Sequence, residues 1–350
     1  MARFSYGGQA LLEGVMMRGR DAVAVALRHP DGRILWADEL LGGGFRSTGW
    51  ARLPFVRGLV VLYETLVIGT RWLIRSAGVA AAEEGTGTDG VPAPASADLG
   101  KGAVALMLGI TLVLGIGLFF VLPLVIAQIV ARGQPGFVER IVEGTAQVAI
   151  FLGYLLLIGR ANDVRRTFQY HGAEHMSIHA LEAGDPLTVE AVRRYPTAHP
   201  RCGTEFLVVV ILVSIFVFSL VGRQEIWLTV ASRVVLIPVI AAIAYELLRF
   251  GARHRRWAIV RWLSAPGIWV QKITTKQPTG DMIEVAIVAL EQALAADGEV
   301  LPEGAGWIER SPLAAPALDA GTRADASPPV EADPPPDADP PVGTGPPADA

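Results

Sequence analysis

The residues best suited to do chemistry are the histidines and the glutamate of the pentapeptide HGAEH, at positions 171–175. His171, Glu174 and His175 have an H-x-x-E-H spacing, the inverted form of the zincin motif. In a helix over 165–181, residues four apart share one face, so the two imidazoles can converge on one ion. The spacing predicts a site for zinc or another divalent metal, with Glu174 as the catalytic base acting on a bound water.

A metal site of this kind needs a further protein ligand, and the sequence leaves its identity open. Glu246 and His199 are the preferred candidates for this ligand. His179 and Glu182, which fall on the same helix face as the motif, are alternatives. Cys202, in the turn sequence HPRCG, can ligate a metal, react or simply pack, and packing is the preferred interpretation.

Further polar residues are candidate site residues without an assigned chemical role. The segment GGQALLEGVMMRG, residues 7–19, carries Glu13 and Arg18 among glycines that allow close backbone approaches. It is hard to explain as a core strand, and it lacks the Gly-Lys-Ser/Thr ending of a phosphate-binding loop. The remaining candidates are Arg57 and Glu64, which we expect to form an ion pair, and Arg201.

The composition indicates a membrane protein. The chain is 51% hydrophobic and 18% charged, below the roughly 25% charged residues of soluble domains. Four apolar stretches are long enough to cross a bilayer and should form two hairpins, 102–160 and 206–250. We therefore predict a mainly α-helical, polytopic membrane protein with about four transmembrane helices. The predicted spans are 103–131, 141–159, 206–222 and 226–250.

The arginines predict the orientation of these spans. The loop 161–205 and its edges hold six arginines, and residues 249–261 hold five, whereas the two short turns hold three. Because basic residues stay in the cytoplasm, this loop and both termini should be cytoplasmic. The predicted location is the bacterial cell membrane, with the lipid bilayer as a partner.

Residues 54–75 are apolar and long enough to span, but Arg57, Glu64 and Arg71 recur every seven residues. A lone lipid-facing Glu64 at mid-bilayer would be costly. We therefore expect segment 51–78 to be an in-plane or re-entrant helix that satisfies its charges by packing. The alternative, a true span, would place the N-terminus outside the cell.

The other segments are assigned by composition. Residues 22–37 should form a β-hairpin around HPDG, which makes 1–50 a small N-terminal unit. Residues 79–101 should be a flexible linker. Residues 251–310 should be cytoplasmic, with Trp and Arg at the headgroups and a helix at 281–296. The Pro-rich tail, 311–350, has a net charge of −6 and should be disordered. No nucleic acid is expected as a partner.

Several motifs in the same order carry a resemblance to a known family. They are GGQALLEGVMMRG, PFVRGLVVLYETL (54–66), YHGAEH (170–175), HPRCGTEFL (199–207) and TTKQPTGDMIEVAIVAL (274–290). Through them, residues 6–295 resemble the YqhQ-like family of bacterial membrane proteins of unknown function, often described as predicted metal-dependent enzymes. The resemblance implies metal chemistry. Met176 stands where the family often has Lys, and His179 lies outside the shared motif.

Two functions of different class fit these residues. In the first, the polar residues form a buried network that docks an inner-membrane complex, such as a translocon, without catalysis. In the second, the H-x-x-E-H motif makes the protein a metal-dependent membrane hydrolase. The docking function is preferred at this stage, because the sequence alone identifies neither a definite third ligand nor an oxyanion hole.

Overall fold

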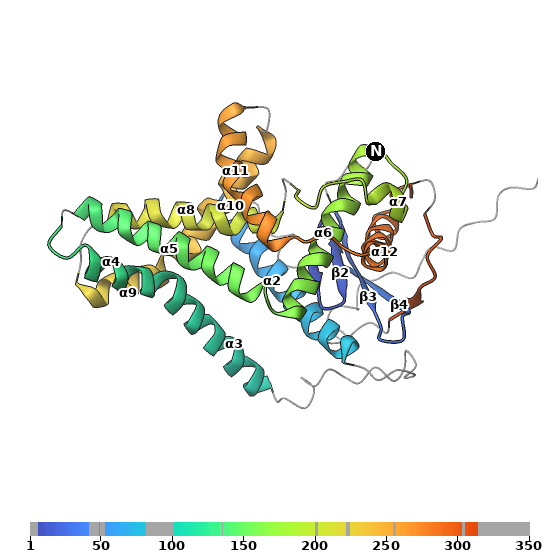
Figure 1. The fold of residues 1–350 in the computed structure, drawn as a ribbon, viewed down its shortest axis with the longest axis horizontal. Helices are drawn as coiled ribbons and strands as arrows, with labels where there is room; N and C mark the ends of the chain where they lie inside the picture. The colour runs from blue at the N-terminus through green and yellow to red at the C-terminus, as the bar shows by residue number, and fades with distance from the viewer. Residues whose placement is uncertain are drawn as a thin grey trace, which may run out of the picture. The chain divides into compact units, whose positions relative to one another are not determined.

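The computed structural model is mainly helical, with a small sheet built from the N-terminal residues (Figure 1). Most of the predicted linker and tail, and also Arg201, lie outside the residues that the structure describes. The described residues are 6–41, 49, 53–81, 101–134, 136–199, 202–221, 225–254, 257–302 and 305–313.

The sheet extends the predicted hairpin in both directions. Its strands follow chain order, with β1 to β4 antiparallel and β5 parallel to β4. The segment GGQALLEGVMMRG supplies the first two strands, so the expectation that it is not a core strand was wrong. Alternate side chains of this segment enter the buried layers on the two faces of the sheet. The glycines in the segment obscured this alternation in the sequence. The strands are β1 Gly7–Leu11, β2 Gly14–Arg18, β3 Ala22–Arg28, β4 Ile34–Leu40 and β5 Ser311–Pro312.

The helices account for most of the remaining described residues. One long apolar helix runs from α3 through a π-helical turn, η4, into α4. The helices are α2 Val56–Ala80, α3 Lys101–Ile116, η4 Gly117–Val121, α4 Leu122–Val130, α5 Gly136–Ile158, α6 Asn162–Ala183, α7 Val189–Val192, α8 Gly203–Val221, α9 Ile226–Val235, α10 Ile237–Arg253, α11 Ala258–Thr274 and α12 Gly280–Ala296.

Within the described part of the chain, three helices are long and apolar enough to cross a membrane, and a bent pair of shorter helices makes a fourth candidate. The pair, α9 and α10, bends by 42°, and Pro238 stands in the first turn of α10. Many of their large apolar side chains are exposed, as expected for association with a lipid bilayer. The predicted mainly helical class with a small N-terminal sheet is thus confirmed, and three or four helices are candidate membrane spans. The three unbroken candidate spans are Gly109–Val130, Gly136–Ile158 and Gly203–Val221.

Helices cover both faces of the sheet. Because side chains alternate along a strand, neighbouring residues of β2 to β4 enter opposite layers. Val15, Met17 and Ala24 pack with α6 and α12, which lie beside the strands in Figure 1. Met16 and Val23 face α2 instead, with Trp72 and Val79 of that helix.

The charged stripe of α2 is satisfied by packing. Arg57 forms an ion pair with Glu246 of α10, Glu64 with Arg18 of β2 at 3.1 Å, and Arg71 with Glu39 of β4 at 2.5 Å. The expected ion pair between Arg57 and Glu64 was wrong, because each finds a partner on a different element. Helix α2 is not among the candidate spans of the described residues. These pairs connect it to the sheet at one end and to α10 at the other.

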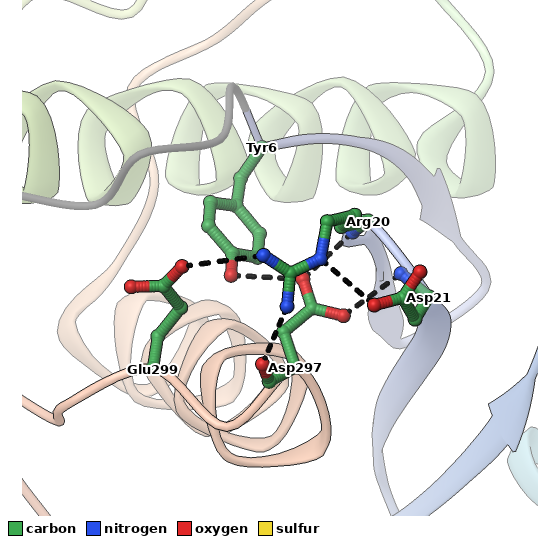
Figure 2. A network of polar contacts seen from close by, with 5 residues as sticks. All are labelled: Tyr6, Arg20, Asp21, Asp297 and Glu299. Atoms are coloured by element: carbon green, nitrogen blue, oxygen red, sulfur yellow. Dashed lines mark hydrogen bonds and ion pairs between the residues drawn. The ribbon is translucent and has the colours of Figure 1, made fainter.

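The end of α12 is fixed to the start of the sheet by Asp297 (Figure 2). Its carboxylate accepts hydrogen bonds from the Tyr6 hydroxyl at 2.9 Å and from the backbone N–H groups of Arg20 and Asp21 at 2.7 and 2.9 Å. The Arg20 guanidinium donates back to the Asp297 carbonyl at 2.9 Å and lies 3.9 Å from Glu299. The turn between β2 and β3 is therefore anchored by residues far along the chain.

Candidate metal centre

The HGAEH motif lies in the middle of α6, where the helix packs tightly against the end of α11. A Cβ atom added at Gly172 would lie 2.2 Å from the carbonyl oxygen of Lys276, so only glycine fits there. His171 and His175 stand one turn apart on this face, with ring centroids 4.4 Å apart. The close approach brings the backbone beyond α11 within reach of the histidine rings.

Backbone carbonyls fix the orientation of both rings. The Nδ1 atom of His171 lies 2.9 Å from the Thr274 carbonyl, and that of His175 lies 2.6 Å from the Thr197 carbonyl. A carbonyl can only accept, so each Nδ1 carries the hydrogen and each Nε2 presents a lone pair. Metal-ligating histidines commonly donate their other ring N–H to a backbone carbonyl in this way.

Cys202 completes a group of three ligand side chains. One ligand atom from each of His171, His175 and Cys202 lies within 4.8 Å of the other two. The Cys202 sulfur is 3.1 Å from Nε2 of His171, and it also contacts the Thr204 hydroxyl at 2.6 Å. Burial raises the pKa of the thiol, while the Thr204 hydroxyl and N–H oppose that shift.

The group fits a metal ion by its donor atoms. Among the described residues, Nε2 of His175 is buried without a hydrogen-bond partner, although such an atom normally finds one. Burial also keeps the pKa of His175 well below its usual range, so the ring is neutral as a ligand must be. Two imidazoles and one sulfur match zinc, and they leave a fourth position open.

Glu174 lies on the sheet side of α6, next to the ligands. It is 4% exposed, and its Oε2 has no hydrogen-bond partner among the described residues. Burial raises the pKa of Glu174 to about 7, whereas the charge of His171 and a hydrogen bond from the Gly8 N–H act in the opposite direction. A Cβ atom added at Gly8 would lie 3.1 Å from this carboxyl. Strand β1 is therefore the support for Glu174.

The structure places the two preferred third ligands in other contacts. Glu246, on α10, accepts hydrogen bonds from the Arg57 guanidinium and from the Phe55 N–H at 3.1 Å, both at the start of α2. His199 groups with His179 and Glu182, one turn beyond the motif. Cys202 was expected to pack and was a less favoured ligand candidate than Glu246 and His199. In the structure it lies beside the motif histidines.

The other predicted site residues connect elements of the fold. Glu13, in the turn between β1 and β2, forms an ion pair with Arg166 of α6 at 2.5 Å and accepts from the Tyr170 hydroxyl at 3.2 Å. Arg18 donates to Thr65 at 2.7 Å in addition to its pairing with Glu64. None of these contacts reaches the three ligands, and Arg201 lies outside the described residues.

No residue pattern pointed to the groups that orient the ligands. The carbonyls of Thr197 and Thr274 are backbone atoms, so their residue types carry no information about the role. Gln271 was also missed. It is fully buried on α11 and holds the backbone of His199. The available signal was a lone glutamine on the apolar side of an otherwise amphipathic helix, which predicts a buried amide with a specific partner.

Comparison with known proteins extends over most of this architecture. Residues 53–296 match the family described as "Protein of unknown function (DUF1385)". The chain is 32% identical over 303 residues to "Uncharacterized protein YqhQ" of Bacillus subtilis (strain 168), covering 83% of this chain and 92% of that protein. No solved structure matches the chain. The family match includes the HGAEH helix and Cys202, and the chain therefore belongs to the DUF1385 family of proteins of unknown function.

Proposed function

We propose that this protein is a multi-pass membrane metalloenzyme that hydrolyses a peptide or lipid bond at the cytoplasmic face of the bilayer. One observation carries the proposal. The ligand atoms of His171, His175 and Cys202 converge, with both rings oriented by backbone carbonyls. Cys202 is therefore our candidate for the third ligand that the sequence left open, and its position favours catalysis over docking.

The three side chains would hold zinc or a similar divalent ion. When bound, such an ion supplies a Lewis acid that lowers the pKa of a coordinated water. Glu174 then takes the proton from the attacking water and returns it to the leaving group. The Gly8 N–H holds its carboxyl in place, and the burial of Glu174 excludes competing bulk water.

The chain positions this group at the ends of its apolar helices. Helix α6 follows the candidate span α5 after a short turn, and Cys202 directly precedes the candidate span α8. A site at this depth would meet bonds near the lipid headgroups or in a membrane-inserted peptide. That position supports a substrate that is itself held by the membrane.

The packing of the sheet supports four crossings. The sheet contacts both α6 and α12, so all three must lie on one side of the bilayer. An even number of crossings must then separate the sheet from α6, and α6 from α12. The first condition is met by α3–α4 and α5 if α2 does not cross. The second is met by α8 and by the bent pair α9–α10 taken as one span. The arginine distribution makes this common side the cytoplasm.

Docking to an inner-membrane complex has weaker support. That network was assigned Glu13, Arg18, Arg57, Glu64 and Arg201. The first four each have an ionic partner within the chain, and Arg201 lies outside the described residues. A partner protein would have to compete with these pairs, so the network is better explained as a support for the fold.

Metal analysis of the purified full-length protein tests the proposal. We expect wild type, prepared without chelator, to carry a divalent ion, and His171→Ala, His175→Ala and Cys202→Ser each to lose one equivalent. His254→Ala is the matched control, because that ring lies at the end of α10 and contacts the Phe250 carbonyl. Glu174→Gln should retain the ion but lose hydrolysis of membrane-embedded peptide or lipid substrates, because the amide cannot accept a proton. Wild-type protein that carries no ion, and gains none on titration, would reject the metalloenzyme.

A further inference from the structure

A second group of ligand side chains lies one turn beyond the first on α6. His179 and Glu182 come from α6, and His199 from the segment facing it, with one ligand atom of each within 4.8 Å of the others. His199 is 2% exposed, whereas the Glu182 side chain is 39% exposed. The group is thus buried at His199 and exposed to solvent at Glu182.

Backbone contacts hold this group in the same way as the first. The His179 Nε2 atom lies 2.9 Å from the Ala198 carbonyl, so Nε2 carries the hydrogen and Nδ1 presents a lone pair. The Gln271 amide fixes the His199 backbone through hydrogen bonds of 2.8 and 2.9 Å. These contacts hold the His179 ring and the His199 backbone in place, and Nε2 of His199 lies on the side of Glu182.

The distance between His199 and Glu182 also suits an ion. Nε2 of His199 and Oε2 of Glu182 are 3.4 Å apart, longer than the 2.7–2.9 Å typical of a charge-assisted hydrogen bond. Two ligands each about 2.1 Å from an ion, at the tetrahedral angle, lie roughly 3.4 Å apart. An ion would replace the shared proton between the two side chains.

We propose that His179, Glu182 and His199 form a second divalent-cation site with nitrogen and oxygen ligands. The rings of His175 and His199 are only 5.7 Å apart between centroids, so the two groups are neighbours along one helix face. An ion held by His179, Glu182 and His199 would supply a further Lewis acid beside the first group. The second site does not depend on whether the first group binds an ion.

The two sites differ in a property that can be measured separately. Only the first contains sulfur, because Cys202 is the single cysteine of the chain. Cobalt(II) bound there should show a sulfur-to-metal charge-transfer band in the near ultraviolet. Cobalt bound by His179, Glu182 and His199 should show only weak visible bands. The probe is cobalt(II) titrated into metal-free, full-length protein in detergent.

We expect wild type to bind two equivalents of cobalt, only one of which gives the charge-transfer band. Glu182→Gln should keep the band and bind the second equivalent at least tenfold more weakly. This side chain is exposed, so the variant should fold. Glu190→Gln, an exposed glutamate on α7, is the control and should bind two equivalents. His199→Ala should repeat the effect of Glu182→Gln.

Cys202→Ser separates this inference from the proposed function. If the band disappears while an equivalent sensitive to Glu182→Gln remains, the second site is supported. If wild type shows no band but binds one Glu182-dependent equivalent, the proposed function fails and the second site stands. Two results would overturn the second site: wild type that binds only one equivalent of cobalt, or Glu182→Gln that binds two equivalents with the affinity of wild type. His199 and Glu182 would then be only a hydrogen-bonded pair.

Discussion

The side-chain amide of Gln271 holds the backbone of His199 on both sides. Its nitrogen donates to the His199 carbonyl at 2.9 Å, and its oxygen accepts from the His199 N–H at 2.8 Å. On the next turn, the Thr275 hydroxyl donates to the Thr197 hydroxyl at 3.2 Å. Helix α11 thus fixes the segment whose carbonyls orient His175 and His179.

Replacing Gln271 by alanine should loosen that segment. Two buried backbone groups would lose their partners, at a cost of about 1–3 kcal/mol each before relaxation. We expect a lower thermal midpoint and weaker divalent-metal binding by Gln271→Ala. Gln169→Ala removes a more exposed contact to the Gln277 carbonyl and serves as the control. Equal thermal midpoints and metal affinities in the two variants would show that the hydrogen bonds between Gln271 and the His199 backbone are unimportant.

Gly8→Ala should disturb the support of Glu174. The added methyl would lie 2.3 Å from the Met16 carbonyl and 3.1 Å from the Glu174 carboxyl, so strand β1 or α6 must shift. We expect destabilisation of roughly 1–3 kcal/mol, as for other overpacked positions, and loss of hydrolytic activity. At Gly7 an added Cβ meets nothing within 4 Å, so Gly7→Ala is the matched control. Denaturant unfolding and activity assays compare the pair, and similar behaviour of both variants would contradict the close packing.

The buried carboxyl of Glu174 should make the metal-free protein sensitive to pH. Its folded-state pKa is raised from 4.5 to about 7, so the folded state holds more protons than the unfolded state between these values. Its stabilising contribution, roughly 3 kcal/mol, is complete below the unfolded pKa and is lost as pH rises through about 7. In chelator, Glu174→Gln should therefore gain stability relative to wild type between about pH 5 and pH 8.

Thermal unfolding of the two proteins across that range measures the effect. Burial also lowers the pKa of His175, but that residue is present in both proteins, so its contribution largely cancels in the difference. The control Glu190→Gln, at an exposed position, should have the same thermal stability as wild type at every pH. A difference between wild type and Glu174→Gln that stays constant with pH would contradict the prediction.

Reporter fusions test the four-crossing arrangement. A fusion after residue 135, in the turn between α4 and α5, should report the outside of the cytoplasmic membrane. Fusions after residues 180 and 260 should report the cytoplasm, since the arginine-rich segments flank them. Activity of an outside-specific reporter at either of the last two positions would be incompatible with the shared side of the sheet, α6 and α12.

The apolar helices were the most predictable part of the fold. Uninterrupted runs of Leu, Val, Ile and Phe define them without reference to any neighbour. The pairing of charges within them was not predictable. Glu143 of α5 and Arg233 of α9 belong to two separate apolar segments, yet they lie 2.6 Å apart. Such a contact depends on how helices pack, which the hydropathy of one segment does not encode.

The residues of the candidate site that lie on one helix could be predicted from the sequence, whereas the residue that packs against this helix from another segment could not. His171, Glu174 and His175 follow from the period of one helix. Cys202 comes from 27 residues further along, and only tertiary packing brings it back to α6. The sheet shows the same limit. Its HPDG hairpin was visible in the sequence, whereas the strand character of residues 7–19 emerges from burial by α2 on one face and α6 on the other.

The bond between Tyr6 and Asp297 joins residues 291 positions apart, and it has a consequence for how the protein is made. The first strands leave the ribosome early, but α12, which covers one of their faces, is among the last elements to be synthesised. At about 5–20 residues per second, the unfinished sheet must wait for tens of seconds while the apolar helices are synthesised. The sheet that supports Glu174 therefore gains its cover by α12, and its bond to Asp297, only after all the candidate membrane spans have been synthesised.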